Sequence, residues 1–250
     1  MKAYVINLER RTDRREHVEQ ELSKMPYIDF EIVKAVDGRA MTPEEKSKRF
    51  DIDKFEKRYS KQADNGAVGC ELSHQKCYKK IVNSSENYAL IFEDDMVVKT
   101  DLNQILEDTK SLYESNKPII ILFGGWFWWN TKHKLNKTCI ASIHDGFLAQ
   151  GYLITKSAAE LLLDERPFIT SDDWRYIIKR GVTVYGVIPH PLEQMWTGSN
   201  DIGYGKSYMI RLSLKYRLRL YGIELIRRLY KLFGHFESCL WLDNLNGHVV

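Results

Sequence analysis

The residues of this chain that could do chemistry begin with three consecutive carboxylates, Glu93, Asp94 and Asp95. They directly follow the apolar run 88–92, whose length and apolar side chains on both faces are typical of a strand at the buried centre of a sheet. Like charges beside low-dielectric packing are costly unless a positive group neutralises them. A hard divalent cation with oxygen ligands would do so and would keep coordination sites for a substrate phosphate. The triplet therefore predicts a metal site, the alternative being a polar strand end that faces water.

A glycine-bearing segment at 66–74 opens a predicted helix. Its glycines would let backbone N–H groups approach a phosphate, to which the helix N-terminus adds partial positive charge. The segment lacks the Lys-Ser/Thr pair of a P-loop. Cys70, His74 and Cys77 share a helical face with Ile81, and we expect core packing there rather than a zinc site. His74 could still turn an imidazole N–H toward a phosphate or a carboxylate.

Polar groups also follow several predicted strands. In open α/β sheets, ligands bind outside the carboxyl ends of the strands. Those ends carry Asn7, Asp37-Gly38, Glu93-Asp94-Asp95, Gly124-Gly125 and, beyond the last strand, Gln194. Four arginines lie within 10–15, directly after the first strand, and their planar guanidinium groups suit phosphate. We expect one or two of them in the site and the others on a solvated helix start.

Four aromatic residues, 126–129, come straight after the glycine turn of a predicted buried strand. We interpret this segment as a loop in which Trp126, Trp128 and Trp129 form a platform for an acceptor sugar, because aromatic rings stack well on the apolar faces of sugars. The alternative is that one or two of the rings simply cover the edge of the sheet.

Two further carboxylates, Asp172 and Asp173, lie at a predicted helix start with Ser171 as its N-cap. The helix dipole favours an aspartate in the first turn, and this accounts for one of the pair. The other could be a general base aimed into the cleft.

Strand-like and helical patterns alternate along the chain, which places all these groups on one α/β domain. With 250 residues, 44% of them hydrophobic, the chain is long enough for one large core. The predicted strands are 3–8, 29–36, 88–92, 118–123, 147–155 and 183–188. The predicted helices are 12–25, a short surface helix opened by Thr42 and Pro43, 66–82, 101–113, 156–164 and 171–179.

Charge is unevenly distributed between a body, 1–205, and a tail, 206–250. The tail carries eight Lys/Arg and three Asp/Glu, whereas the body carries 29 against 31. Cationic residues alternate with apolar ones at 209–220, and leucines take helical spacing from Tyr221 onward. We predict that this basic amphipathic tail lies on an anionic membrane surface. Packing onto the body is an alternative; nucleic acid is disfavoured because the body is slightly acidic and lacks a recognition module.

Cysteine usage and hydropathy bear on the compartment. The four cysteines form no CxxC pair and no dense framework, which fits a reducing environment. No stretch reaches the roughly 18 apolar residues needed to span a bilayer, and the first apolar run is too short for a signal peptide. We therefore expect a cytoplasmic protein, peripheral on the inner face of the cytoplasmic membrane.

Taken together, these segments resemble glycosyltransferase family 25, the lipooligosaccharide-type galactosyltransferases, which also include collagen galactosyltransferase domains. The Gly-Cys-x-x-Ser-His and Glu-Asp-Asp elements are distinctive, and the order and spacing of all the segments make the match specific. The matching segments are Val5-Ile6-Asn7-Leu8 with Arg14-Arg15, Ala35-Val36-Asp37-Gly38, Gly69 to His74, Phe92 to Asp95, Gly151 to Ile154, an aspartate near 172, and Pro191 through Gln194 to Ser199.

The resemblance implies a GT-A-like nucleotide-sugar-binding fold, with a mixed central sheet flanked by helices. It also implies a Mn²⁺ or Mg²⁺ ion and inverting transfer from a UDP-sugar, usually UDP-galactose, to a lipooligosaccharide- or lipopolysaccharide-type glycan. The acidic triplet would take the place of the Asp-x-Asp motif, with Asp95 and Glu93 at the metal and Glu93 also facing the ribose. The UDP-sugar would be contacted by Asn7, Arg14, Asp37, Gly38, Gly69, Ser73, His74, Glu93, Asp94 and Gln194.

One departure concerns the predicted base. The family usually shows Pro-hydrophobic-Asp before the acidic helix start, where this chain reads Thr170-Ser171-Asp172-Asp173, and we favour Asp172. Two other function classes remain open. A haloacid-dehalogenase-type phosphatase would need an aspartyl nucleophile where this chain has Glu93, and a non-catalytic sugar- or nucleotide-binding protein would not need every acidic position that the chemistry requires.

Overall fold

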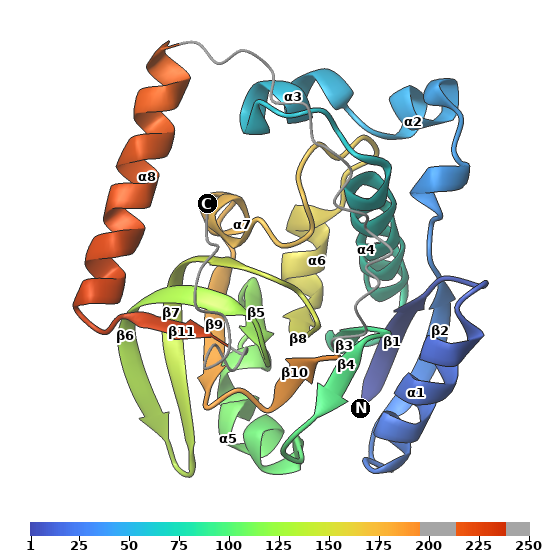
Figure 1. Ribbon diagram of the computed structural model, residues 1–250. Coiled ribbons are helices and arrows are strands. Elements are labelled where there is room, and N and C mark those ends of the chain that lie inside the picture. Colours follow the sequence, from blue (N-terminus) through green and yellow to red (C-terminus); the bar gives the residue numbers. More distant parts are fainter. Residues whose placement is uncertain (196–213, 239–250) are drawn as a thin grey trace.

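The computed structural model describes residues 1–195 and 214–238, and a mixed sheet lies at the centre of the described protein (Figure 1). Its strands are β1 (Lys2–Asn7), β2 (Asp29–Lys34), β3 (Tyr88–Glu93), β5 (Ile119–Leu122), β6 (Trp126–Leu135), β7 (Thr138–Phe147), β8 (Gly151–Thr155), β9 (Thr183–Ile188) and β11 (Phe236–Ser238). Their spatial order is β11-β6-β7-β9-β5-β8-β3-β1-β2. Two short strands, β4 (Met96–Val98) and β10 (Leu192–Gln194), pair separately.

Helices cover both faces of this sheet. They are α1 (Thr12–Ser23), α2 (Pro43–Arg49), α3 (Ile52–Tyr59), α4 (Asn65–Asn83), α5 (Asn103–Tyr113), α6 (Lys156–Leu162), α7 (Trp174–Lys179) and α8 (Leu214–Leu232), with a 3₁₀ turn η1 (Gly38–Ala40). Side chains of α4, α6 and α7 pack on one face, and those of α1 and α5 pack on the other. The mixed sheet between two helical layers confirms the predicted α/β class.

Strand β3 is the buried central strand that the sequence predicts. It pairs in parallel with β1 and antiparallel with β8, so both of its sides are occupied. Leu90, Ile91 and Phe92 are fully buried, with Leu90 and Phe92 in one core cluster and Ile91 in the other. Burying each such side chain stabilises the fold by about 1.5–3 kcal/mol. The carboxylates at its end therefore follow directly on a fully buried stretch of strand.

Local sequence signals explain where several helices begin. Thr42 accepts a hydrogen bond from the backbone N–H of Glu45, whose side chain accepts one from the backbone N–H of Thr42, which is a complete capping box for α2. Asp64 caps α4 by accepting from the N–H of Ala67 at 2.8 Å. The predicted helix starts at both positions are confirmed within one residue.

The segment after β5 differs from the prediction. Residues 126–129 are not a loop but the first part of β6, which forms a long hairpin with β7. The predicted strand 147–155 is confirmed for 151–155 but is not continuous, since β7 ends at Phe147 and β8 begins at Gly151. Asn136, with a left-handed φ of 50°, lies in the short turn between β6 and β7. Asparagine tolerates that conformation, so this residue was the available signal for a hairpin.

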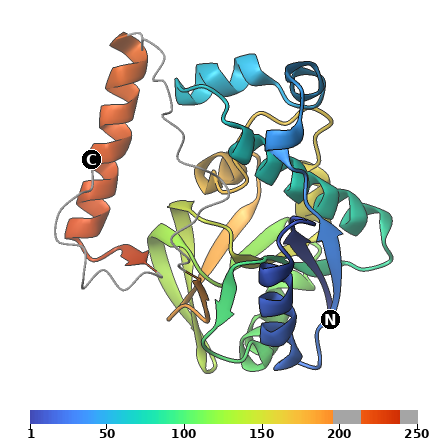
Figure 2. The ribbon, with the colours of Figure 1, turned by 45° about the vertical axis from the view of Figure 1, so that its right-hand side comes forward.

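The described part of the tail is attached to the body. The period-two pattern predicted at 209–220 is wrong for 214–220, which belong to α8; the predicted positions 206–213 and 239–250 lie outside the described residues. Strand β11 pairs with β6, and both views show α8 standing at one side of the molecule (Figures 1 and 2). Arg227 of α8 donates from Nε to the buried carboxylate of Asp145 at 2.9 Å. Among the described helices, none is long and apolar enough to cross a bilayer.

Candidate active site

The acidic triplet lies where β3 ends and the chain turns into β4. Asp94 and Asp95 form this turn, and β10 pairs with β4 directly beside it. The side-chain amide of Gln194 donates to Asp95 Oδ2 at 3.0 Å, and the backbone N–H of Met195 donates to the carbonyl of Asp95 at 2.7 Å. Residues about 100 positions apart in the chain thus fix one carboxylate, and the predicted proximity of Gln194 to the triplet is confirmed.

A buried arginine neutralises part of the charge of this turn. Arg14 Nη1 lies 3.1 Å from Asp94 Oδ1 and 3.5 Å from Asp95 Oδ2, and only 7% of Arg14 is exposed. Asn7, at the end of β1, donates from Nδ2 to Asp94 Oδ2 at 2.8 Å. Asn7, Arg14 and Asp94 therefore meet as a hydrogen-bonded group. The positive partner expected for the triplet is in part an arginine from α1.

Asp95 keeps one carboxylate oxygen without a partner. Its Oδ1 is buried and has no hydrogen bond among the described residues. Burial, followed by the nearby charge of Glu93, raises the pKa of Asp95 to about 7, and burial also raises the pKa of Asp94. A buried oxygen that carries negative charge and lacks a donor is suited to a cation. Asp95 thus fits a divalent ion with oxygen ligands.

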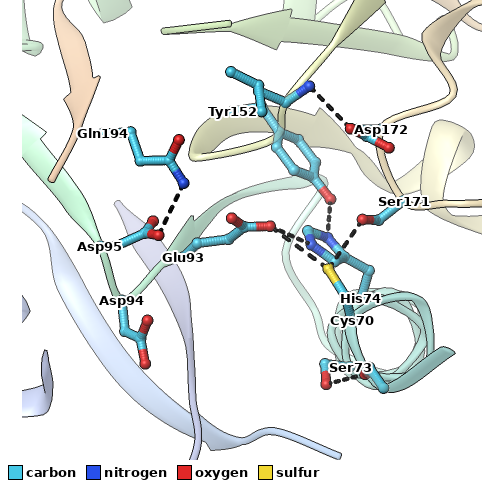
Figure 3. A network of polar contacts seen from close by, with 12 residues as sticks. Cys70, Ser73, His74, Glu93, Asp94, Asp95, Tyr152, Ser171, Asp172 and Gln194 are labelled. Carbon is cyan, nitrogen blue, oxygen red and sulfur yellow. Dashed lines mark hydrogen bonds and ion pairs between the residues drawn. The ribbon is translucent and has the colours of Figure 1, made fainter. Parts of the chain in front are cut away.

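Glu93 turns toward α4 (Figure 3). Its Oε1 lies 3.3 Å from His74 Nε2 and 3.7 Å from Cys70 Sγ. The other ring nitrogen of His74 contacts the hydroxyl of Tyr152 at 2.7 Å. Cys77 is buried in the core as predicted, and the alternative that His74 faces a carboxylate is confirmed, whereas the expectation of core packing is wrong for Cys70, which also faces Glu93. The spacing of four residues between Cys70 and His74 was the available signal.

Two glycines let α4 approach the loop after β2 closely. A Cβ on Gly69 would lie 2.6 Å from the carbonyl oxygen of Val36, and one on Gly38 would lie 1.8 Å from that of Asn65. Ser73 ties the two segments together, because its hydroxyl accepts from the N–H of Val36 at 2.8 Å and donates to the carbonyl of Gly69 at 2.6 Å. These three predicted nucleotide-binding residues have packing roles in the structure; their contact with UDP stays a prediction.

Asp37 lies on the same loop but in a separate ion pair. Its Oδ1 accepts from the N–H of Arg39 at 3.1 Å, which caps η1, and its Oδ2 pairs with Arg10. Within the described residues, the two carboxylate oxygens of Asp37 contact Arg39 and Arg10 rather than the acidic turn. Asp37 therefore lies at the edge of the candidate site and is not part of the acidic turn.

The two candidate bases have different environments. Asp173 Oδ2 accepts from Arg58 Nε at 2.8 Å and Nη2 at 2.6 Å, as well as from the hydroxyl of Tyr59. Asp173 also caps α7, a role that the sequence interpretation wrongly gave to Ser171. Asp172 accepts from the N–H of Leu148 at 3.1 Å, and burial raises its pKa. Asp173 is thus held in an ion pair, whereas Asp172 accepts a backbone hydrogen bond and has a raised pKa.

The tryptophan residues pack against the end of the chain. Trp129 stacks on His235 at 4.1 Å between ring centroids, and Trp128 lies 5.0 Å from the ring of Phe236. Trp128 and Trp129 are each only 9% exposed, and Trp126 is half-buried. The prediction that 126–129 form an open loop is therefore wrong. The structure fits the alternative, in which the rings cover the edge of the sheet.

The mixed sheet with an acidic turn at the carboxyl end of a central strand is consistent with a GT-A-like glycosyltransferase fold. The family model "Glycosyltransferase family 25 (LPS biosynthesis protein)" matches residues 1–173, and the chain belongs to this family.

Several relatives are similar over part of their length. A procollagen lysyl hydroxylase and glycosyltransferase of Acanthamoeba polyphaga mimivirus is 30% identical over 209 residues, 74% of this chain and 22% of the relative. A glycosyltransferase 25 family member of Aedes aegypti is 28% identical over 176 residues, and procollagen galactosyltransferase 2 of Homo sapiens is 26% identical over 180. Each of these two alignments covers 66% of this chain and 28% of the relative. The chain therefore spans less than a third of the length of these relatives.

Proposed function

We propose that this chain is an inverting glycosyltransferase that moves galactose from UDP-galactose to a hydroxyl of a lipooligosaccharide- or lipopolysaccharide-type glycan. Family membership supports the transferase class, and relatives named procollagen galactosyltransferase support galactose as the donor sugar. The observation that carries the proposal is the buried, unpartnered Oδ1 of Asp95 within the described residues, at the carboxyl end of a central strand.

The donor site would include a divalent cation, Mn²⁺ or Mg²⁺. Asp95 is the residue whose geometry fits the ion, and Glu93 would join it by turning from His74 toward the acidic turn. When bound, the ion would stabilise the negative charge that develops on the departing diphosphate. The guanidinium of Arg14, 3.5 Å from Asp95, would add a fixed positive charge beside the same phosphates.

The acceptor hydroxyl would attack the sugar from the side opposite the diphosphate. A general base there removes the proton of the hydroxyl, an effect typically worth about 10²–10⁴ in rate. Asp172 suits this role because its pKa is raised and, within the described residues, its carboxylate forms no ion pair. Asp173, bound to Arg58, would instead hold α7 in position.

The acceptor would be lipid-linked and reached from an anionic membrane surface. On α8, Leu214, Leu218, Tyr221 and Leu225 recur every three or four residues and are 59–72% exposed. Such a stripe can enter the headgroup region of a bilayer, while neighbouring basic residues attract anionic lipids. We therefore also propose that the protein binds the inner face of the cytoplasmic membrane through α8.

The activity is tested by incubating the protein with Mn²⁺ and a panel of UDP-sugars and measuring UDP release with and without glycan acceptors. The expected result is acceptor-dependent release of UDP from UDP-galactose, with loss of activity in Asp95→Ala. Release of inorganic phosphate from phosphomonoesters would support a phosphatase instead. Nucleotide binding without any turnover would support a non-catalytic binding protein.

Membrane binding is tested by sedimentation with vesicles that contain phosphatidylglycerol. The variant Leu218→Glu/Leu225→Glu is expected to lose most of its vesicle binding while keeping its activity on a soluble acceptor. Leu161→Glu is the matched control, because Leu161 is an exposed leucine of α6 in the body. Equal sedimentation of all three proteins would refute the role of α8.

A further inference from the structure

Three side chains of different chemistry meet between α4 and the end of β3. Cys70 and His74 are one helical turn apart on α4, and Glu93 is the last residue of β3. One ligand atom from each residue, the thiol sulfur, an imidazole nitrogen and a carboxylate oxygen, lies within 4.8 Å of the other two. Figure 3 shows the three groups converging on one point.

Two of the three separations between these ligand atoms match the geometry of a tetrahedral zinc ion. With bonds of about 2.3 Å to sulfur and about 2.0 Å to nitrogen or oxygen, neighbouring ligand atoms of such an ion lie about 3.3–3.6 Å apart. In the structure, Glu93 Oε1 is 3.3 Å from His74 Nε2 and 3.7 Å from Cys70 Sγ. The third separation, between Cys70 Sγ and His74 Nε2, is at most 4.8 Å.

The imidazole of His74 is oriented as in many metal-binding histidines. Metal-bound histidines usually donate their second N–H to an oxygen, which fixes both the tautomer and the ring. Here Nδ1 lies 2.7 Å from the hydroxyl of Tyr152, which in turn contacts the hydroxyl of Tyr78 at 3.1 Å. If Nδ1 carries the proton, the lone pair of Nε2 points at a carboxylate oxygen, an unfavourable pairing that a cation would resolve.

We propose that Cys70 Sγ, His74 Nε2 and Glu93 Oε1 bind Zn²⁺, with water as the fourth ligand. A sulfur–nitrogen–oxygen set favours zinc over Mg²⁺ and Mn²⁺, which prefer oxygen ligands. This site lies between Glu93 and α4, and Asp95 is not one of its ligands. Because the two sites share Glu93, zinc would fix this carboxylate away from the acidic turn.

Cobalt(II) substitution tests the site without reference to turnover. In a tetrahedral thiolate site, Co²⁺ gives an intense sulfur-to-cobalt charge-transfer band in the near ultraviolet and visible d–d bands. We expect these bands in the wild-type protein and in Cys77→Ser, which removes another cysteine of the same helix face. Cys70→Ser is expected to lose the charge-transfer band. Competition with a chromophoric chelator is expected to show about 100-fold weaker zinc binding for Cys70→Ser, because even the loss of a supporting outer partner weakens metal binding about 10–100-fold.

A second variant tests the site independently in case Cys70→Ser does not fold, which is checked by circular dichroism. Glu93→Gln keeps the thiol, so it is expected to retain the charge-transfer band while binding zinc at least about tenfold more weakly. Persistence of the band in Cys70→Ser would overturn the proposal, since another cysteine would then be the ligand. Failure of the wild-type protein to compete with the chelator for zinc would also overturn it.

Discussion

The substitution Asp95→Asn removes one buried negative charge from the acidic turn and preserves the shape of the side chain. Burial, with help from Glu93, raises the pKa of Asp95 from 3.8 to about 7. Since the pKa is higher in the folded state than in the unfolded state, the folded protein binds this proton more tightly and ionised Asp95 opposes folding. The contribution of Asp95 to stability is therefore present below the unfolded pKa and is lost as pH rises toward the folded value.

The size of the effect follows from the two pKa values. The gap between 3.8 and about 7 corresponds to about 4 kcal/mol, at roughly 1.4 kcal/mol for each pH unit. Asparagine resembles the protonated carboxyl and keeps an oxygen for the amide of Gln194. We expect Asp95→Asn to raise the free energy of unfolding by up to about 4 kcal/mol at about pH 8 and to change it little at about pH 4.

The assay is urea unfolding in a chelating buffer at both pH values, followed by tryptophan fluorescence. The control is Asp53→Asn, an exposed aspartate in the first turn of α3, which is expected to change stability by less than about 0.5 kcal/mol. Identical unfolding midpoints for Asp95→Asn and the wild-type protein at about pH 8 would refute the electrostatic reasoning. Mn²⁺ at about 100 times its dissociation constant is expected to stabilise the wild-type protein by about 2.7 kcal/mol and Asp95→Asn much less.

Three further substitutions separate catalytic from packing roles. Asp172→Asn is expected to slow sugar transfer by about 10²–10⁴ with unchanged UDP binding by calorimetry, and an unaltered rate would exclude this residue as the base. Asp173→Asn leaves the mostly buried Arg58 without its carboxylate and is expected to lower the free energy of unfolding in urea by about 3 kcal/mol; a change within error would show that the ion pair is not stabilising. Gly69→Ala would place a Cβ 2.6 Å from the carbonyl oxygen of Val36. We expect this change to lower the free energy of unfolding by about 1–3 kcal/mol, and an unchanged melting temperature would contradict the reasoning.

Much of the fold is predictable from local signals because its strands and helices are individually well marked. The apolar runs of β3 and β5 can only be buried, and Thr42 and Asp64 sit where helix caps belong. The hairpin of β6 and β7 is not evident from the sequence because its outer half is polar and exposed, so this half lacks the apolar pattern of a strand that packs on a core. Its aromatic half is buried by α8 and β11, which come about 100 residues later in the chain.

Which residues gather at the site is easier to predict from the sequence than which of them contact one another. The carboxylates, Asn7, Arg14 and Gln194 could be grouped because strand ends meet at one side of a sheet. That Arg14 contacts both Asp94 and Asp95 depends on the rotation of α1, which adjacent arginines do not reveal. The direction of Glu93, which faces α4, is indicated only by the four-residue spacing of Cys70 and His74, and that spacing does not identify Glu93 as their partner.

The final described strand has a consequence for how this protein can be shortened. Strand β11 covers the backbone of 126–128, the beginning of the ten-residue strand β6. Without it, free N–H and C=O groups would be presented to neighbouring molecules, which is a route to aggregation. A truncated protein could then sediment by itself and mimic vesicle binding, so side-chain replacements on α8 are a cleaner probe of lipid association than removal of the whole segment.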